Sequence, residues 1–126
     1  MKVFSLQHYI QQWSWVFKIV FYTVLVMGCY MAFSPVDGGI QVRFNDKFLH
    51  AAGFFVMAFI SQLAHPTTRF IVLSVGLSCF GLTIELVQAY LPYRSFSLWD
   101  LGADILGIGL YFILFGHFLK EKSVPD

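Results

Sequence analysis

Charged residues are scarce in this chain. They make up only 12% of its 126 residues, whereas about a quarter of an average soluble domain is charged. Hydrophobic residues account for 58% of the sequence and aromatic residues for 19%. This balance excludes an ordinary soluble domain and is typical of an integral membrane protein. At this length we expect a single membrane domain over residues 1–126.

Cysteine and net charge are also low. The two cysteines, Cys29 and Cys79, both lie inside apolar runs, where they are best interpreted as small hydrophobic residues rather than as a disulfide framework. The formal net charge is +1, which gives no reason to expect a nucleic-acid partner.

Four apolar runs dominate what is present, and turn signals at Ser34-Pro35, His65-Pro66 and Pro92 separate them. Each run is close to the roughly 20 residues that a helix needs to cross a bilayer. We therefore predict an all-α integral membrane bundle of four transmembrane helices, preceded by a short N-terminal amphipathic segment. The predicted spans cover residues 15–33, 48–64, 69–91 and 98–119.

The basic residues set the expected orientation, because cytoplasmic loops carry an excess of Lys and Arg. Four spans place both termini on one side. That side would carry Lys2, Lys18, Arg69, Lys120 and Lys122, and the other side Arg43, Lys47 and Arg94. We therefore expect a multi-pass protein of the inner (plasma) membrane with both termini in the cytoplasm.

Short polar side chains mark two helix starts. Asn45 or Asp46 could cap the second span, and Ser97 could cap the fourth, by accepting hydrogen bonds from free first-turn amides. Asp100 then lies in the first turn of the fourth span, near the positive end of the helix dipole.

The ionisable residues of the apolar runs gather at span ends that share one membrane face. Alternation of the spans alone brings together the start of the second, the end of the third and the start of the fourth. An ionisable group in hydrocarbon costs roughly 2.5–3.5 kcal/mol on insertion scales, so it needs a partner, a wet cavity or a task. The residues concerned are Asp46, Lys47, His50, Glu85, Gln88, Arg94, Asp100 and Asp104.

Helical spacing indicates which of these residues share a face. Asp100, Asp104 and Gly107 follow an i, i+4, i+7 pattern, which is a single stripe. Gly107 and Gly109 would let a neighbouring helix approach closely. We therefore expect a polar pocket beneath the outer membrane interface.

The set resembles the VanZ-like family of small bacterial integral membrane proteins. The matching motifs are Asp46-Lys47-x-x-His50, then Glu85-x-x-Gln88-x-x-x-Pro92-x-Arg94, then Asp100-x-x-x-Asp104-x-x-Gly107. They cover about residues 44–110. The sequence departs from the family at Asp104, where Asn is usual. The resemblance implies a place in cell-envelope biology, since the family's named member is associated with low-level resistance to the antibiotic teicoplanin.

The functional interpretation assigns a role to each polar residue. Lys47 and Arg94, with Asp46 and Gln88, would bind an anionic lipid-linked or cell-envelope ligand. The candidate catalytic residues are His50 and Glu85, which would exchange protons, and Asp100 and Asp104, which would orient them. The expected partners are membrane lipid and a lipid-linked envelope precursor, and the chain could also form oligomers. The sequence leaves open whether a reaction is catalysed.

A structural interpretation stands beside this one. His50 could simply bond to Asp46, and Glu85 could tie helices together through Arg94, Lys47 or His50. Gln88 is better explained by a structural hydrogen bond across helices. Arg94 could equally pair with Asp100. In this interpretation the protein is a non-enzymatic structural or interaction protein.

Other classes of site have less support. Carboxylates with one imidazole suit Mn, Mg or Zn, but no HExxH or Cys/His spacing is present, and we expect neither a metal nor another cofactor. Ser95 and Ser97 lie outside any Gly-x-Ser-x-Gly motif, so a serine nucleophile is weakly supported. A transporter is a third interpretation, for which four spans are few.

Overall fold

The computed structural model describes the backbone of residues 2–35 and 41–116, with their side chains except those of residues 2–5 and 41–46. Five α-helices form within these ranges, which confirms the all-α prediction. Their bounds are α1 Lys2–Gln12, α2 Ser14–Phe33, α3 Gln41–Ala64, α4 Phe70–Tyr90 and α5 Leu98–Leu114.

Three of the described helices are long and apolar enough to cross a membrane. They are α2, α3 between Lys47 and Ala64, and α4. The chain is therefore a membrane protein. The helix α5 has 17 described residues, and at about 1.5 Å per residue it is a few ångströms shorter than the roughly 30 Å hydrocarbon core. The structure thus supports a membrane protein with three candidate spans among the described residues. It does not by itself show a fourth span.

Several helix ends lie where the turn signals predict. The α2 helix ends at Phe33, before Ser34-Pro35, and α4 ends at Tyr90, before Pro92. Ser97 caps α5, because its Oγ accepts the Asp100 backbone N–H at 3.3 Å. The predicted extension of this helix to residue 119 lies partly outside the described residues.

The start of α3 differs from the prediction. The helix begins at Gln41, so Asn45 and Asp46 lie inside it and neither is its N-cap. No Gly or Pro interrupts residues 41–52, and the helix therefore includes polar residues that precede the predicted span 48–64.

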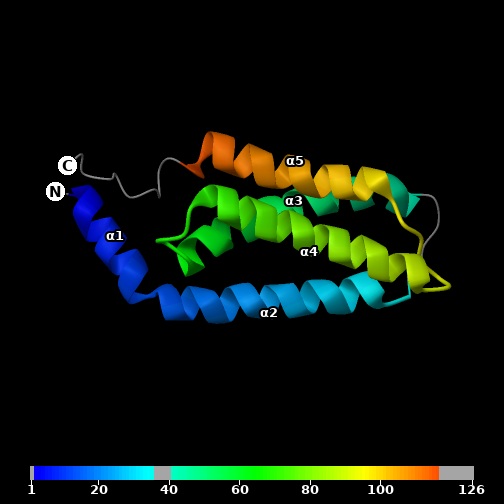
Figure 1. The fold of residues 1–126 in the computed structure, drawn as a ribbon, viewed down its shortest axis with the longest axis horizontal. Helices are drawn as coiled ribbons and strands as arrows, with labels where there is room; N and C mark the ends of the chain where they lie inside the picture. The colour runs from blue at the N-terminus through cyan, green and yellow to red at the C-terminus, as the bar shows by residue number, and fades with distance from the viewer. Residues whose placement is uncertain (1, 36–40, 117–126) are drawn as a thin grey trace.

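The four long helices lie side by side, and α1 leaves the bundle at an angle (Figure 1). The starts of α3 and α5 lie at the same end of the bundle as the end of α4, which confirms that the three polar segments converge. The α3 and α5 helices run parallel and pack closely. The core between the helices includes Ala58 and Tyr111, which are 0% and 2% exposed.

A main-chain contact sets the spacing of α3 and α5. A Cβ added at Gly107 would collide with the Ala51 carbonyl oxygen and lie 2.9 Å from the Ala51 carbonyl carbon. Gly107 therefore permits the close approach predicted for it. A Cβ at Gly109 would meet nothing within 4 Å, so the same prediction for Gly109 is wrong, because Gly109 lies on another face of α5.

Candidate functional site

Five polar side chains from three helices meet at the end of the bundle where α3 and α5 begin. We call this group the acidic cluster. Its most buried members are carboxylates, since Glu85, Asp104 and Asp100 are only 0%, 1% and 9% exposed. The members are Lys47 and His50 from α3, Glu85 from α4, and Asp100 and Asp104 from α5.

His50 lies between the two aspartates of α5. Its Nδ1 is 2.7 Å from Asp104 Oδ1, and its Nε2 is 3.8 Å from Asp100 Oδ2. When Asp104 is ionised its carboxylate can only accept, and the short contact then requires a hydrogen on Nδ1. The Asp104 carboxylate therefore orients the imidazole so that Nε2 faces Asp100.

Lys47 lies at the exposed edge of the acidic cluster. Its Nζ donates to Asp100 Oδ1 at 3.2 Å, and the side chains of Lys47 and Asp100 are 45% and 13% exposed. Asp100 thus uses one oxygen toward Lys47 and turns the other toward His50. The ammonium group remains accessible to a ligand arriving from outside the bundle.

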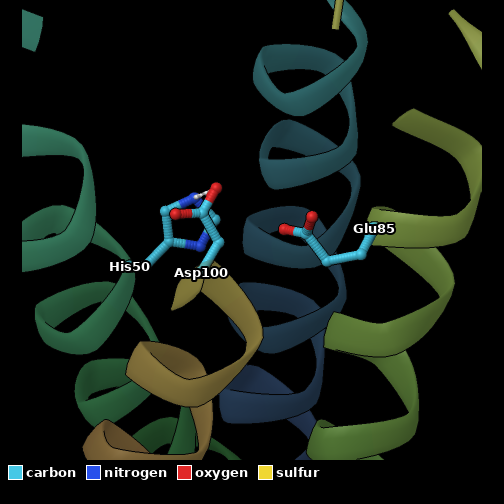
Figure 2. A group of neighbouring side chains, drawn as sticks. All are labelled: His50, Glu85 and Asp100. Atoms are coloured by element: carbon cyan, nitrogen blue, oxygen red, sulfur yellow. Dashed lines mark ion pairs between the residues drawn. The ribbon is translucent and has the colours of Figure 1, made fainter. Parts of the chain in front are cut away.

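Glu85 approaches the acidic cluster from α4. Its Oε2 accepts the Ser97 backbone N–H at 2.9 Å. Its Oε1 is buried and has no hydrogen-bond partner among the described residues. Figure 2 shows the Glu85 carboxylate pointing toward His50 and Asp100. These three residues can each offer one ligand atom, and the three atoms lie within 4.8 Å of one another.

Gly81 makes room for the acidic cluster, one turn before Glu85 on the same face of α4. A Cβ at Gly81 would lie 2.8 Å from Asp104 Oδ2 and 3.3 Å from Phe54 Cζ. The Asp104 carboxylate therefore fits against bare α4 backbone. Sequence reasoning missed this residue, although its i, i+4 spacing from Glu85 was a usable signal.

Arg94 lies outside the acidic cluster and bonds to the end of α2. Its Nε and Nη2 donate to the Ser34 carbonyl oxygen at 3.2 and 2.8 Å, and Nη2 also donates to the Met31 carbonyl oxygen at 3.0 Å. These carbonyls have no partner within the helix. In the described part of the chain, Arg94 pairs with neither Glu85 nor Asp100. The predicted ties to those residues are therefore wrong.

Gln88 and Tyr93 reinforce the same helix end. Gln88 Nε2 donates to the Ala32 carbonyl oxygen at 2.9 Å, and the Tyr93 hydroxyl donates to the Phe33 carbonyl oxygen at 2.5 Å. The structural hydrogen bond predicted for Gln88 is confirmed. The Asp46 side chain lies outside the described residues, so its expected roles in ligand binding and in bonding His50 stay predictions.

A second polar group lies toward the opposite end of the bundle, and sequence reasoning gave it no role. The Tyr111 hydroxyl donates to Gln62 Oε1 at 2.6 Å, and Gln62 Nε2 donates to the Gly116 carbonyl oxygen at 3.2 Å. His65 contacts the Ser61 carbonyl oxygen through Nδ1 and the Tyr22 hydroxyl through Nε2, both at 3.2 Å. We call Tyr22, Ser61, Gln62, His65 and Tyr111 the neutral cluster.

The acidic cluster combines an oriented imidazole with an excess of carboxylates. His50 can accept or donate a proton at Nε2, and the Glu85 carboxylate points toward His50 and Asp100. Positive charge comes from Lys47 and, when protonated, from His50. The arrangement can therefore transfer protons or hold a cation, and its exposed ammonium can contact an anionic group.

Comparison with known proteins gives one relative and no assigned function. The chain is 31% identical over 100 residues to the uncharacterized protein C11E3.10 of Schizosaccharomyces pombe, a match that covers 75% of this chain. The chain spans 59% of that relative's length. No family model matches the chain, and no solved structure matches it.

Proposed function

We propose that this chain is a VanZ-like multi-pass membrane protein whose acidic cluster binds the polar headgroup of an anionic lipid-linked or cell-envelope ligand. The observation that carries the proposal is the meeting of His50, Glu85, Asp100 and Asp104 behind the exposed ammonium of Lys47. Burying three carboxylates at the end of a helix bundle costs free energy, which favours a functional role over a chance arrangement.

The proposed topology has four spans, with α5 as the fourth. The acidic cluster then lies at the outer face of the plasma membrane and both termini lie in the cytoplasm. The support is the convergence of the starts of α3 and α5 with the end of α4 (Figure 1), together with the excess of basic residues toward the other face.

Within this site, Lys47 contacts the anionic group and His50 exchanges a proton with it. Asp104 holds the imidazole through the 2.7 Å contact to Nδ1, and Asp100 links Lys47 to His50. Arg94 contributes by hydrogen-bonding the end of α2 beside the site. Direct binding of the anion is not its main role in this proposal.

Native mass spectrometry tests ligand binding. The purified protein is mixed with a polyprenyl phosphate, and phosphatidylcholine serves as the neutral control. Lys47→Gln should remove the phosphate adduct. Lys18→Gln, which changes another exposed lysine, toward the other end of the bundle, should retain it. Equal adducts on wild type and the Lys47 variant would overturn the proposal.

Cysteine labelling tests the proposed orientation. In a background with Cys29 and Cys79 changed to Ser, an outside reagent should label Ser95→Cys in the exposed α4–α5 connection. It should label His8→Cys, on exposed α1, only after permeabilisation. The reverse pattern would place the acidic cluster in the cytoplasmic leaflet.

A structural role is the second candidate, and the paired contacts between α3 and α5 favour it. Lys47 bonds Asp100, and His50 bonds Asp104. If the pairs serve only to hold helices together, reversing Lys47 and Asp100 as a double change should restore what each single change loses. Failure of the reversed pair to restore ligand binding, with stability recovered, would favour the binding site.

A further inference from the structure

The acidic cluster contains a buried oxygen that the fold itself leaves without a partner. Glu85 is 0% exposed, and its Oε1 has no hydrogen-bond partner among the described residues. A buried acceptor without a donor typically costs about 1–3 kcal/mol, and more when it is charged. The carboxylate that carries this oxygen points toward His50 and Asp100 (Figure 2). A cation held between these residues would satisfy this oxygen.

His50 is prepared to supply a lone pair at the same point. Its Nδ1 is held by Asp104 at 2.7 Å, and its Nε2 lies 3.8 Å from Asp100 Oδ2. A carboxylate that hydrogen-bonds one imidazole nitrogen and orients the other is the usual support of a metal-binding histidine. Asp104 thus has the position of an outer partner, and Nε2 that of a ligand.

Asp100 supplies a third donor. Lys47 occupies its Oδ1 at 3.2 Å, which leaves Oδ2 on the side of His50. The ligand atoms of His50, Glu85 and Asp100 lie within 4.8 Å of one another. Donors on opposite sides of a metal are about 4.0–4.4 Å apart, twice the usual metal–ligand distance. A small inward movement of the side chains therefore completes the site.

We propose that His50, Glu85 and Asp100 bind one divalent transition-metal cation, with Asp104 as the positioning residue for His50. One imidazole and two carboxylates form a mixed nitrogen and oxygen set, which suits Mn²⁺ or Zn²⁺ better than a soft metal. Three protein ligands leave further coordination positions open to water or to an anionic group. The cation extends the proposed function without resting on it.

The cation also changes the charge of the site. Three carboxylates in a small volume repel a phosphate, and Lys47 alone offsets only one of them. A divalent cation at this point would turn the acidic cluster into an anion receptor. Cation binding without any lipid would leave the metal site standing and overturn only the headgroup proposal.

Electron paramagnetic resonance of Mn²⁺ tests the site on the intact protein in detergent. Wild type should bind one Mn²⁺ per chain, and Zn²⁺ should displace it. Glu85→Gln and Asp100→Asn should each abolish this binding. Asp104→Asn should weaken it by roughly 10–100-fold, as losses of outer partners do.

A matched histidine pair separates the site from surface binding. His50→Gln should abolish Mn²⁺ binding, whereas His8→Gln, which changes an exposed histidine of α1, should leave it unchanged. Size-exclusion profiles and circular dichroism show whether each variant remains folded. The proposal is overturned if wild type binds no Mn²⁺, or if folded Glu85→Gln and Asp100→Asn both bind it as wild type does.

Discussion

The two polar clusters solve the same problem in different ways. Both place polar side chains between apolar helices, and they lie about 18 Å apart along α3 if measured from His50 to Gln62 at 1.5 Å per residue. In the neutral cluster, hydroxyl, amide and imidazole groups pair with one another and with main-chain carbonyls. In the acidic cluster, Glu85 Oε1 remains without a partner among the described residues.

This difference favours a structural role for the neutral cluster. A polar network inside a bundle stabilises it when every donor and acceptor is matched. Among the described residues, no buried side-chain oxygen or nitrogen of the neutral cluster lacks a hydrogen-bond partner, so its contacts need no ligand to explain them. The acidic cluster gathers carboxylates around a Glu85 oxygen that has no hydrogen-bond partner among the described residues, which the fold alone does not explain. Substitutions in the neutral cluster should therefore lower stability more than binding. Substitutions in the acidic cluster should lower binding more than stability.

The largest effect should come from separating α3 and α5 beside the acidic cluster. Gly107→Ala places a Cβ against the main chain of Ala51, and the backbone must shift. We expect a loss of about 3 kcal/mol or more, the upper range for overpacking. Thermal unfolding in detergent measures it. Gly109→Ala is the control, since its Cβ meets nothing within 4 Å, and it should stabilise the helix by about 0.5–1 kcal/mol. Equal melting temperatures for the two variants would contradict the close contact.

The next effect should come from opening the neutral cluster. Tyr111→Phe removes the hydroxyl that donates to Gln62 Oε1 at 2.6 Å and leaves that buried oxygen without its donor. We expect a loss of about 1–3 kcal/mol with no change in Mn²⁺ or lipid binding. Thermal unfolding and the binding assays measure the two outcomes together. A Tyr111→Phe protein of wild-type stability would remove the contrast between the clusters.

A smaller change in stability should follow from Glu85→Gln. The amide oxygen can still accept the Ser97 N–H, and the amide nitrogen would face carboxylate acceptors where Oε1 had no donor. We expect stability to change by less than about 1 kcal/mol, or to rise, while Mn²⁺ binding is lost. A strongly destabilised variant would mean that the buried charge itself holds the bundle together.

The smallest effect on stability should come from Lys47→Gln. The Lys47 side chain is 45% exposed, and an exposed ion pair contributes at most about 1 kcal/mol. Unfolding should therefore be almost unchanged, whereas the polyprenyl phosphate adduct should disappear. Loss of both properties in this one variant would place Lys47 in the structural framework.

Much of the fold follows from local signals in the sequence. The apolar runs, the prolines and the Ser97 cap predict helix order and most ends, and the alternation of spans predicts that Lys47, His50, Glu85 and Asp100 meet. These inferences need only chain length and periodicity. The start of α3 was missed because a polar segment without Gly or Pro remains helical when tertiary packing supports it.

The partners of individual side chains were harder to predict. Arg94 was expected to bind an acid or an anion, yet its hydrogen bonds go to main-chain carbonyls at the end of α2. Carbonyl acceptors carry no sequence signature, since every residue has one. His65 was missed for the same reason, because one of its partners is the Ser61 carbonyl oxygen. The VanZ-like resemblance and the bound ligand stay predictions.

The contact between Gly107 and Ala51 also determines which wall of the site can adapt. Because the two backbones already touch, smaller side chains cannot bring α3 and α5 closer together. His50, Asp100 and Asp104 therefore form a rigid side of the site. Glu85 sits on α4, whose approach at Gly81 is limited by side chains of Asp104 and Phe54 rather than by main chain. The site would therefore adapt to ligands of different size by shifts of α4 toward or away from the fixed pair of α3 and α5.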